Sequence, residues 1–175
     1  ADIIGSTGIL CELELVSLFS EALKGLGVPG YRILVNDRRI LAGIADSIGV
    51  DADRLTDWTV AVDKLDKVGV DGVCDELERR GFDAEVLSGT QNMLVQRPEG
   101  EAGMAALVSE FAHPLVEEGI QSLRTLWSLS NGEGIAAPEL VFAPGLARGL
   151  NYYTGAIFEV QVEGAPVGSI CGGGR

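Results

Sequence analysis

The first fifty residues alternate between helical and strand-like hydrophobic patterns. Residues 12–27 place apolar side chains at helical spacing, and two glycines near the end of this run suit a helix C-terminus. The short run 31–37, YRILVND, is rich in β-branched and aromatic residues and predicts a strand. Residues 37–50 then predict a second helix, with the carboxylate of Asp37 as its N-cap.

The middle of the chain is helical in pattern. Apolar positions continue at helical spacing over residues 56–81, where Gly69 and Gly72 are expected to divide the run into two helices. One or two further helices are predicted beyond a turn-rich break, and Pro114 is expected to open the second, because proline suits the first helical position. Residues 51–135 are therefore expected to form a mainly helical insertion.

After residue 135 the pattern changes to short apolar runs bounded by glycine and proline. The runs PELVFAPG, AIFEVQV and PVGSICGGG predict strands, and the opening residues ADII also have the pattern of a strand. This order of elements predicts a mixed α/β (α+β) fold. Residues 1–50 and 136–175 are expected to share one sheet-containing core, with the helical insertion as a lobe beside it.

Both ends of the sequence are expected to fall inside structural elements. ADII begins without a turn before it, and CGGGR closes on a glycine loop without an element after it. The sequence therefore predicts that these 175 residues are the middle of a longer domain.

Composition argues against several classes of protein. No apolar run approaches the roughly 18 residues that a membrane-spanning helix needs, and the first residues lack the basic start of a secretory signal. The three cysteines are odd in number and far apart, which favours reduced cytoplasmic thiols over disulfides or a zinc site. The net charge of −13 disfavours a nucleic-acid surface spread over the whole chain.

Candidate chemistry concentrates near the end of the chain. Arg148 lies in APGLARGLNYYTG, in a turn that leads into a predicted strand. Its planar guanidinium can bind a phosphate or a carboxylate, although a lone arginine in such a turn is more often a surface or salt-bridging residue. Tyr152 and Tyr153 are adjacent, so on a strand they face opposite sides. A phenol can hydrogen-bond a polar ligand while its ring packs.

Other candidates are weaker when each is taken alone. Gly172, Gly173 and Gly174 allow a backbone to approach a flat ring or a phosphate, but a flexible loop is the simpler interpretation, and the spacing matches neither a P-loop nor a dinucleotide fingerprint. Asp2 is either an edge residue or an anion for an ammonium group. His113 is interpreted as structural, residues 62–68 as a solvated helix face, and no metal site is predicted.

Taken together, these residues resemble one family. ARGLNYYTGAIFEV followed by GSICGGGR resembles the second histidine-specific motif of histidyl-tRNA synthetases and the glycine-rich strand after it, in a form closest to one bacterial subgroup. VNDRRILAGI…VDKLDKV, within residues 35–68, resembles the segment between that family's second motif and its inserted domain, and ADIIG is similar to the end of the motif 2 strand. The resemblance is loosest over about 70–130. It implies part of the class II antiparallel sheet core with an inserted helical lobe.

The resemblance also implies an activity. Members activate histidine with ATP and Mg²⁺ and pass the histidyl group to tRNA(His), as homodimers in the cytoplasm. By this likeness Arg148 would stabilise charge on the α-phosphate. Asp2, Tyr152 and Tyr153 would bind histidine, and the backbone of 172–174 would contact histidine or the adenylate.

The chain also departs from the family. Asn151 stands where members usually carry Asp, and motif 1, the Thr-Pro-Glu loop, the motif 2 arginine, motif 3 and the anticodon-binding domain are absent from these residues. The 175 residues alone are therefore expected to be inactive and to bind no cofactor tightly. Two alternatives remain open: a paralogue like the regulatory subunit of ATP phosphoribosyltransferase, which binds histidine without aminoacylation, and a pseudo-synthetase that senses uncharged tRNA. The intact ARGLNYYTG and the long insertion favour the ligase, and the acidic surface disfavours the tRNA sensor.

Overall fold

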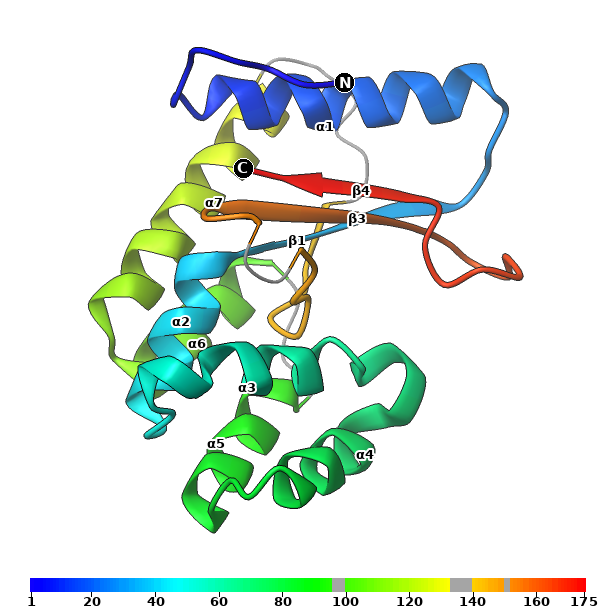
Figure 1. Ribbon diagram of the computed structural model, residues 1–175. Coiled ribbons are helices and arrows are strands. Elements are labelled where there is room, and N and C mark those ends of the chain that lie inside the picture. Colours follow the sequence, from blue (N-terminus) through cyan, green and yellow to red (C-terminus); the bar gives the residue numbers. More distant parts are fainter. Residues whose placement is uncertain (96–99, 133–139, 150–151) are drawn as a thin grey trace.

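The computed structural model describes residues 1–95, 100–132, 140–149 and 152–175 (Figure 1). Within these ranges the elements follow in the order α1 (Leu10–Gly25), β1 (Tyr31–Asp37), α2 (Arg38–Ser47), the short 3₁₀ helix η1 (Ala52–Arg54), α3 (Leu55–Val62), α4 (Leu65–Arg79), α5 (Ala84–Leu94), α6 (Glu101–Phe111), α7 (Pro114–Gly132), β2 (Leu140–Phe142), β3 (Ala156–Val162) and β4 (Cys171–Gly174). None of the described helices is both long and apolar enough to cross a membrane.

The strands form a mixed sheet in the order β2-β1-β3-β4. β1 pairs with β3 and β3 with β4 in antiparallel fashion, whereas β1 and β2 are parallel. The predicted α/β fold class is thus confirmed, and strands from both ends of the sequence share one sheet. The register places Leu34, Glu159 and Gly172 side by side on three neighbouring strands.

Two helix starts follow the predicted local chemistry. Asp37 ends β1 in extended conformation, and its carboxylate accepts a hydrogen bond from the backbone N–H of Arg39 (2.9 Å), which caps α2. Arg39 also donates to the same carboxylate from Nε (2.9 Å) and Nη2 (2.7 Å), so the buried acid is neutralised where the strand becomes a helix. Pro114 opens α7 as predicted.

Three sequence-based assignments need correction. ADII is not a strand: these residues have no regular structure, and Ile4 is 90% exposed. The helical run 56–81 has a break after Val62 that was not predicted; the predicted division at Gly69 is confirmed by its backbone (φ 68°, ψ 179°), whereas Gly72 stays within α4. Helix α5 had no predicted counterpart of its own.

The helices lie on both sides of the sheet (Figure 1). α1 lies along one side, and α3, α4 and α5 lie on the other side, where the loop after β2 comes close to Leu65 and Leu94 at Gly145. The fully buried Trp58 donates from Nε1 to Oγ1 of Thr90 (2.8 Å), which joins α3 to α5. α7 packs against α2, α1, β1 and β3, so helices from the middle of the chain also cover the sheet. The division into a core and a 51–135 insertion stays a prediction.

Candidate functional site

The loop that carries Arg148 is held by the end of β1. Asn36 is completely buried, and its amide Nδ2 donates to the carbonyl oxygens of Pro144 (2.9 Å) and Leu146 (3.0 Å). Arg38 donates from Nη1 to the carbonyl of the residue before Arg148 (3.3 Å). Burial lowers the pKa of Arg38, and the nearby charge of Asp63 opposes that shift. These contacts fix the backbone from which Arg148 projects.

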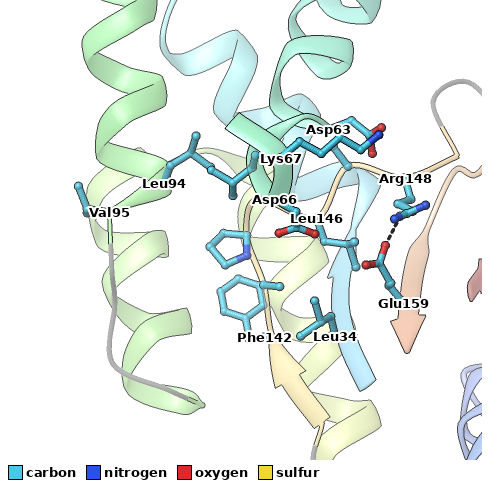
Figure 2. A pocket seen from close by; sticks show the side chains of 15 residues that line it. Leu34, Asp63, Asp66, Lys67, Leu94, Val95, Phe142, Leu146, Arg148 and Glu159 are labelled. Atoms are coloured by element: carbon cyan, nitrogen blue, oxygen red, sulfur yellow. Dashed lines mark ion pairs between the residues drawn. The ribbon is translucent and has the colours of Figure 1, made fainter. Parts of the chain in front are cut away.

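Arg148 forms an ion pair with Glu159 of β3, between Nε of the arginine and Oε2 of the acid (Figure 2). The Glu159 side chain is 1% exposed, whereas that of Arg148 is half exposed. The other carboxylate oxygen, Oε1, accepts a hydrogen bond from Nε2 of Gln161 (2.9 Å). Among the residues that the structure describes, Nη1 and Nη2 of Arg148 have no partner. The two terminal nitrogens of a cation are thus available at the surface.

The two tyrosines differ in environment. Tyr152 is 83% exposed and meets Tyr153 edge to face, with ring centroids 5.1 Å apart. The ring of Tyr153 packs between two glycines: a Cβ at Gly149 would collide with it, and a Cβ at Gly174 would lie 2.7 Å from it. Gly149 also has a left-handed backbone (φ 76°). Tyr153 is therefore held in one place by residues without side chains.

A depression of about 340 Å³ brings several predicted site residues together. Arg148, Tyr153, Gly172 and Gly173 all line it, whereas Gly174 lies behind the Tyr153 ring and does not line it. Asp2 is exposed and does not line this depression. Asn151 lies outside the described residues.

The three glycines of β4 have different surroundings. A Cβ at Gly172 would lie 2.8 Å from the carbonyl oxygen of Phe158 on the neighbouring strand, so a side chain there would push the strands apart. The Tyr153 ring fills the space where a side chain at Gly174 would lie. A Cβ at Gly173 would meet no atom within 4 Å, which leaves open space in the depression. Gly173 is therefore the glycine of this run best placed to face a ligand.

A second cavity of about 280 Å³ lies between the sheet and the helical segment (Figure 2). Glu159 and Arg148 line it from one side, and Asp63, Asp66 and Lys67 line it from the helices. Asp63, Asp66 and Lys67 are exposed, as the solvated-face interpretation requires, but all three also face this cavity, and Lys64 is half-buried in a pair with Glu76. Arg148 lines both cavities and lies between them.

The sequence analysis did not single out Asn36, Arg38 or Glu159. Glu159 had a usable signal, because an acid inside the apolar run AIFEV must be neutralised once the strand is buried. Asn36 had a similar signal in the strand YRILVND, where a buried amide needs partners. Which partners these groups find depends on the fold, so the pattern alone could not name them.

Metal binding and cysteine chemistry find no support at the site. In the described ranges no group of three or more His, Cys, Asp or Glu side chains could hold a metal. His113 lies 3.0 Å from Oδ2 of Asp46 through Nε2 and accepts from the N–H of Leu115 through Nδ1 (3.2 Å), which fits a structural role at the start of α7. Burial raises the pKa of the Cys171 thiol, so it stays protonated beside the depression.

Comparisons with known proteins identify a family. The family model described as histidyl-tRNA synthetase matches residues 1–175. The histidine–tRNA ligase of Porphyromonas gingivalis is 43% identical over 99% of this chain and 38% of its own length. That of Cytophaga hutchinsonii is 37% identical over 100% of this chain and 39% of its own. The chain thus spans about two fifths of the curated relatives it matches.

Solved structures show the same fold. A crystal structure of histidyl-tRNA synthetase from Nostoc sp. PCC 7120 superposes with a TM-score of 0.87 at 23% identity, covering 97% of this chain and 40% of that one. An ATP phosphoribosyltransferase regulatory subunit/histidyl-tRNA synthetase from Bacillus halodurans superposes at 0.81 with 19% identity, covering 98% and 43%. The fold is shared by both, and the family follows from the full-length profile match and the curated relatives: the chain belongs to the histidyl-tRNA synthetase family.

Proposed function

We propose that this chain supplies part of the histidine-activating site of a histidine–tRNA ligase. The observation that carries the proposal is the arrangement around Arg148: a cation whose terminal nitrogens have no partner in the described part of the chain, beside Tyr153 and the open backbone at Gly173. The names of the curated relatives support the same activity. The regulatory alternative has support only from a structural neighbour at 19% identity.

The proposed chemistry is adenylate formation. A carboxylate oxygen of histidine attacks the α-phosphorus of ATP, the bond from that phosphorus to the bridging oxygen breaks, and pyrophosphate leaves with the electron pair. Negative charge shifts among the phosphate oxygens as this occurs. Arg148 would donate to them from Nη1 and Nη2, and a preorganised cation of this kind lowers the barrier without rearranging.

The histidine substrate would lie in the depression beside Arg148. Tyr153 would offer its hydroxyl to a polar group of histidine, and Gly172 and Gly173 would form the backbone wall. Contacts from Asp2 and Tyr152 stay predictions, because neither residue lines this depression. Mg²⁺ would enter with ATP as part of the substrate. By family likeness the protein would act as a homodimer in the cytoplasm, and tRNA(His) would accept the histidyl group.

The test is made on the protein expressed from its gene, with any sequence that flanks these residues. Histidine-dependent exchange of pyrophosphate into ATP, together with charging of tRNA(His), is the expected result. Histidine binding in calorimetry with neither reaction would overturn the proposal in favour of a regulatory protein. Arg148→Ala serves as the control for exchange caused by a contaminating synthetase, because a contaminant would be insensitive to it.

A further inference from the structure

The ion pair of Arg148 and Glu159 continues into a chain of polar contacts. Gln161, two residues further along β3, donates from Nε2 to Oε1 of Glu159 (2.9 Å) and also lies 3.2 Å from Oδ2 of Asp66. Asp66 belongs to α4, and it lines the same cavity as Arg148 and Glu159. The site arginine is therefore connected through three side chains to the helical segment.

Glu159 is an unusual residue for its position. Its side chain is 1% exposed in a strand that is otherwise apolar up to Val160, and a buried carboxylate is unfavourable unless a cation neutralises it. Oε2 has no hydrogen-bond partner among the described residues and only the charge of Arg148 beside it. A leucine would fill such a position at no electrostatic cost. The acid therefore has a purpose other than packing.

The geometry of the pair indicates what that purpose is. Arg148 is half exposed and has a long flexible side chain, so its loop anchors fix its backbone but not its guanidinium. Glu159 contacts Nε, the nitrogen nearest the stem. Because the guanidinium is planar and rigid, holding Nε sets the direction of the two terminal nitrogens and leaves them free.

We propose that Glu159 is the positioning residue of Arg148. It acts through the arginine and touches no substrate. Gln161 of β3 braces it, and Asp66 of α4 in turn accepts a hydrogen bond from Gln161. This inference rests on the proposed function, in which Arg148 stabilises the α-phosphate. It adds a specific demand: the rate of adenylate formation depends on a buried acid that lies behind the cation.

The kinetic test compares two substitutions in the expressed protein by pyrophosphate exchange. Glu159→Ala releases Nε, and a misplaced catalytic group costs about 10²-fold in kcat. Glu159→Gln keeps an oxygen for Nε, so a loss of only about tenfold is expected, with little change in the KM for histidine in either variant. A raised histidine KM with unchanged kcat would overturn the proposal, because Glu159 would then bind substrate directly.

A double-mutant cycle separates positioning from an independent effect. If Glu159 acts only through Arg148, adding Glu159→Ala to Arg148→Ala lowers kcat no further. Multiplying effects would overturn the proposal. Glu12→Gln is the matched control, since Glu12 is also a buried acid paired with an arginine, Arg175. It is expected to lower the melting temperature with little change in kcat, which shows that lost stability alone does not lower the rate.

A measurement that needs no activity completes the test. In ¹⁵N-labelled protein the Nε–H of Arg148, assigned by its loss in Arg148→Lys, is expected to exchange slowly with water, and faster in Glu159→Ala. Equal exchange in both proteins would overturn the proposal. If the unmodified protein lacked pyrophosphate exchange, the proposed function would fall, and the Nε–H exchange would still decide whether Glu159 holds Arg148.

Discussion

Two buried glutamates are each paired with an arginine, but the two arginines use different numbers of their guanidinium nitrogens. Glu12 of α1 receives two hydrogen bonds from Arg175, from Nε (2.5 Å) and Nη2 (2.6 Å), while Nη1 donates to the carbonyl of Thr7 (2.8 Å). Glu159 is paired with Arg148 through Nε of the arginine alone, and Gln161 donates to its other carboxylate oxygen. Within the part of the chain that the structure describes, all three guanidinium nitrogens of Arg175 contact protein groups, whereas only Nε of Arg148 does.

This difference separates a structural arginine from one that can serve a ligand. Both pairs neutralise a buried acid, so charge balance alone does not distinguish them. What distinguishes them is which guanidinium nitrogens make the contact. A pair that uses Nε and Nη2 together occupies the donors that could bind a ligand, whereas a pair that uses Nε alone leaves both terminal nitrogens for one. The first two predictions below each test one of the two pairs, and the later two test residues outside them.

The largest effect is expected at the pair of Arg148 and Glu159. Arg148→Ala removes the cation that meets the developing charge, so kcat and kcat/KM for pyrophosphate exchange should fall together by about 10²–10³-fold, with a smaller change in histidine affinity. Lysine should restore only part of the rate, because a point charge cannot reproduce the planar fork. An increase in the histidine KM at unchanged kcat would make Arg148 a binding residue.

At the pair of Glu12 and Arg175, the expected loss is in stability. Arg175→Leu leaves Glu12 buried without its cation, and we expect unfolding by urea to require about 3 kcal/mol less free energy, near the low end for buried pairs because Arg175 is partly exposed. The double variant Glu12→Leu with Arg175→Leu should recover much of that loss. A single variant as stable as the parent would show that this pair is not a structural clamp.

The sequence predicted most of the architecture and only part of the site. Periodicity identified β1, α2 and the strands after residue 135, because a half-buried strand or helix carries its pattern locally. The family likeness named Arg148 and Tyr153, which the structure places in one depression. The partner Glu159 could not be named, since its contact with Arg148 depends on how a loop and a strand meet.

The opening residues are a case in which the pattern predicted a strand that does not form. ADII has the composition of a strand, but a strand needs a neighbour to pair its backbone, and no described strand lies beside these residues. Asp2 belongs to this segment. The family likeness placed it at the site, but it is exposed here because the segment pairs with no described strand. Pattern predicts which segments can form strands, and only pairing decides which of them do.

A smaller effect distinguishes two glycines beside Arg148. Gly149→Ala forces a left-handed backbone on a residue with a Cβ, worth about 1–2 kcal/mol, and pushes that Cβ into the Tyr153 ring. We expect a clear loss of stability in urea unfolding. Gly173→Ala meets no atom within 4 Å, so stability should stay within about 0.5 kcal/mol while the KM for histidine rises. Equal destabilisation by both would contradict this assignment of roles.

The smallest effect is expected at a third glutamate, Glu76, which is only partly buried. Hydrogen bonds from Lys64 and Arg80 lower the pKa of Glu76 from 4.5 to about 2, with Arg79 adding charge. Because the folded-state pKa is depressed, the stabilisation is complete above about pH 4.5 and disappears as the pH falls through about 2. The melting temperatures of the parent and Glu76→Gln should therefore differ slightly at pH 5 and converge towards pH 2. A difference that stays constant over this range would mean that the charge of Glu76 contributes nothing, and that among these acids only the two buried ones depend on their arginines.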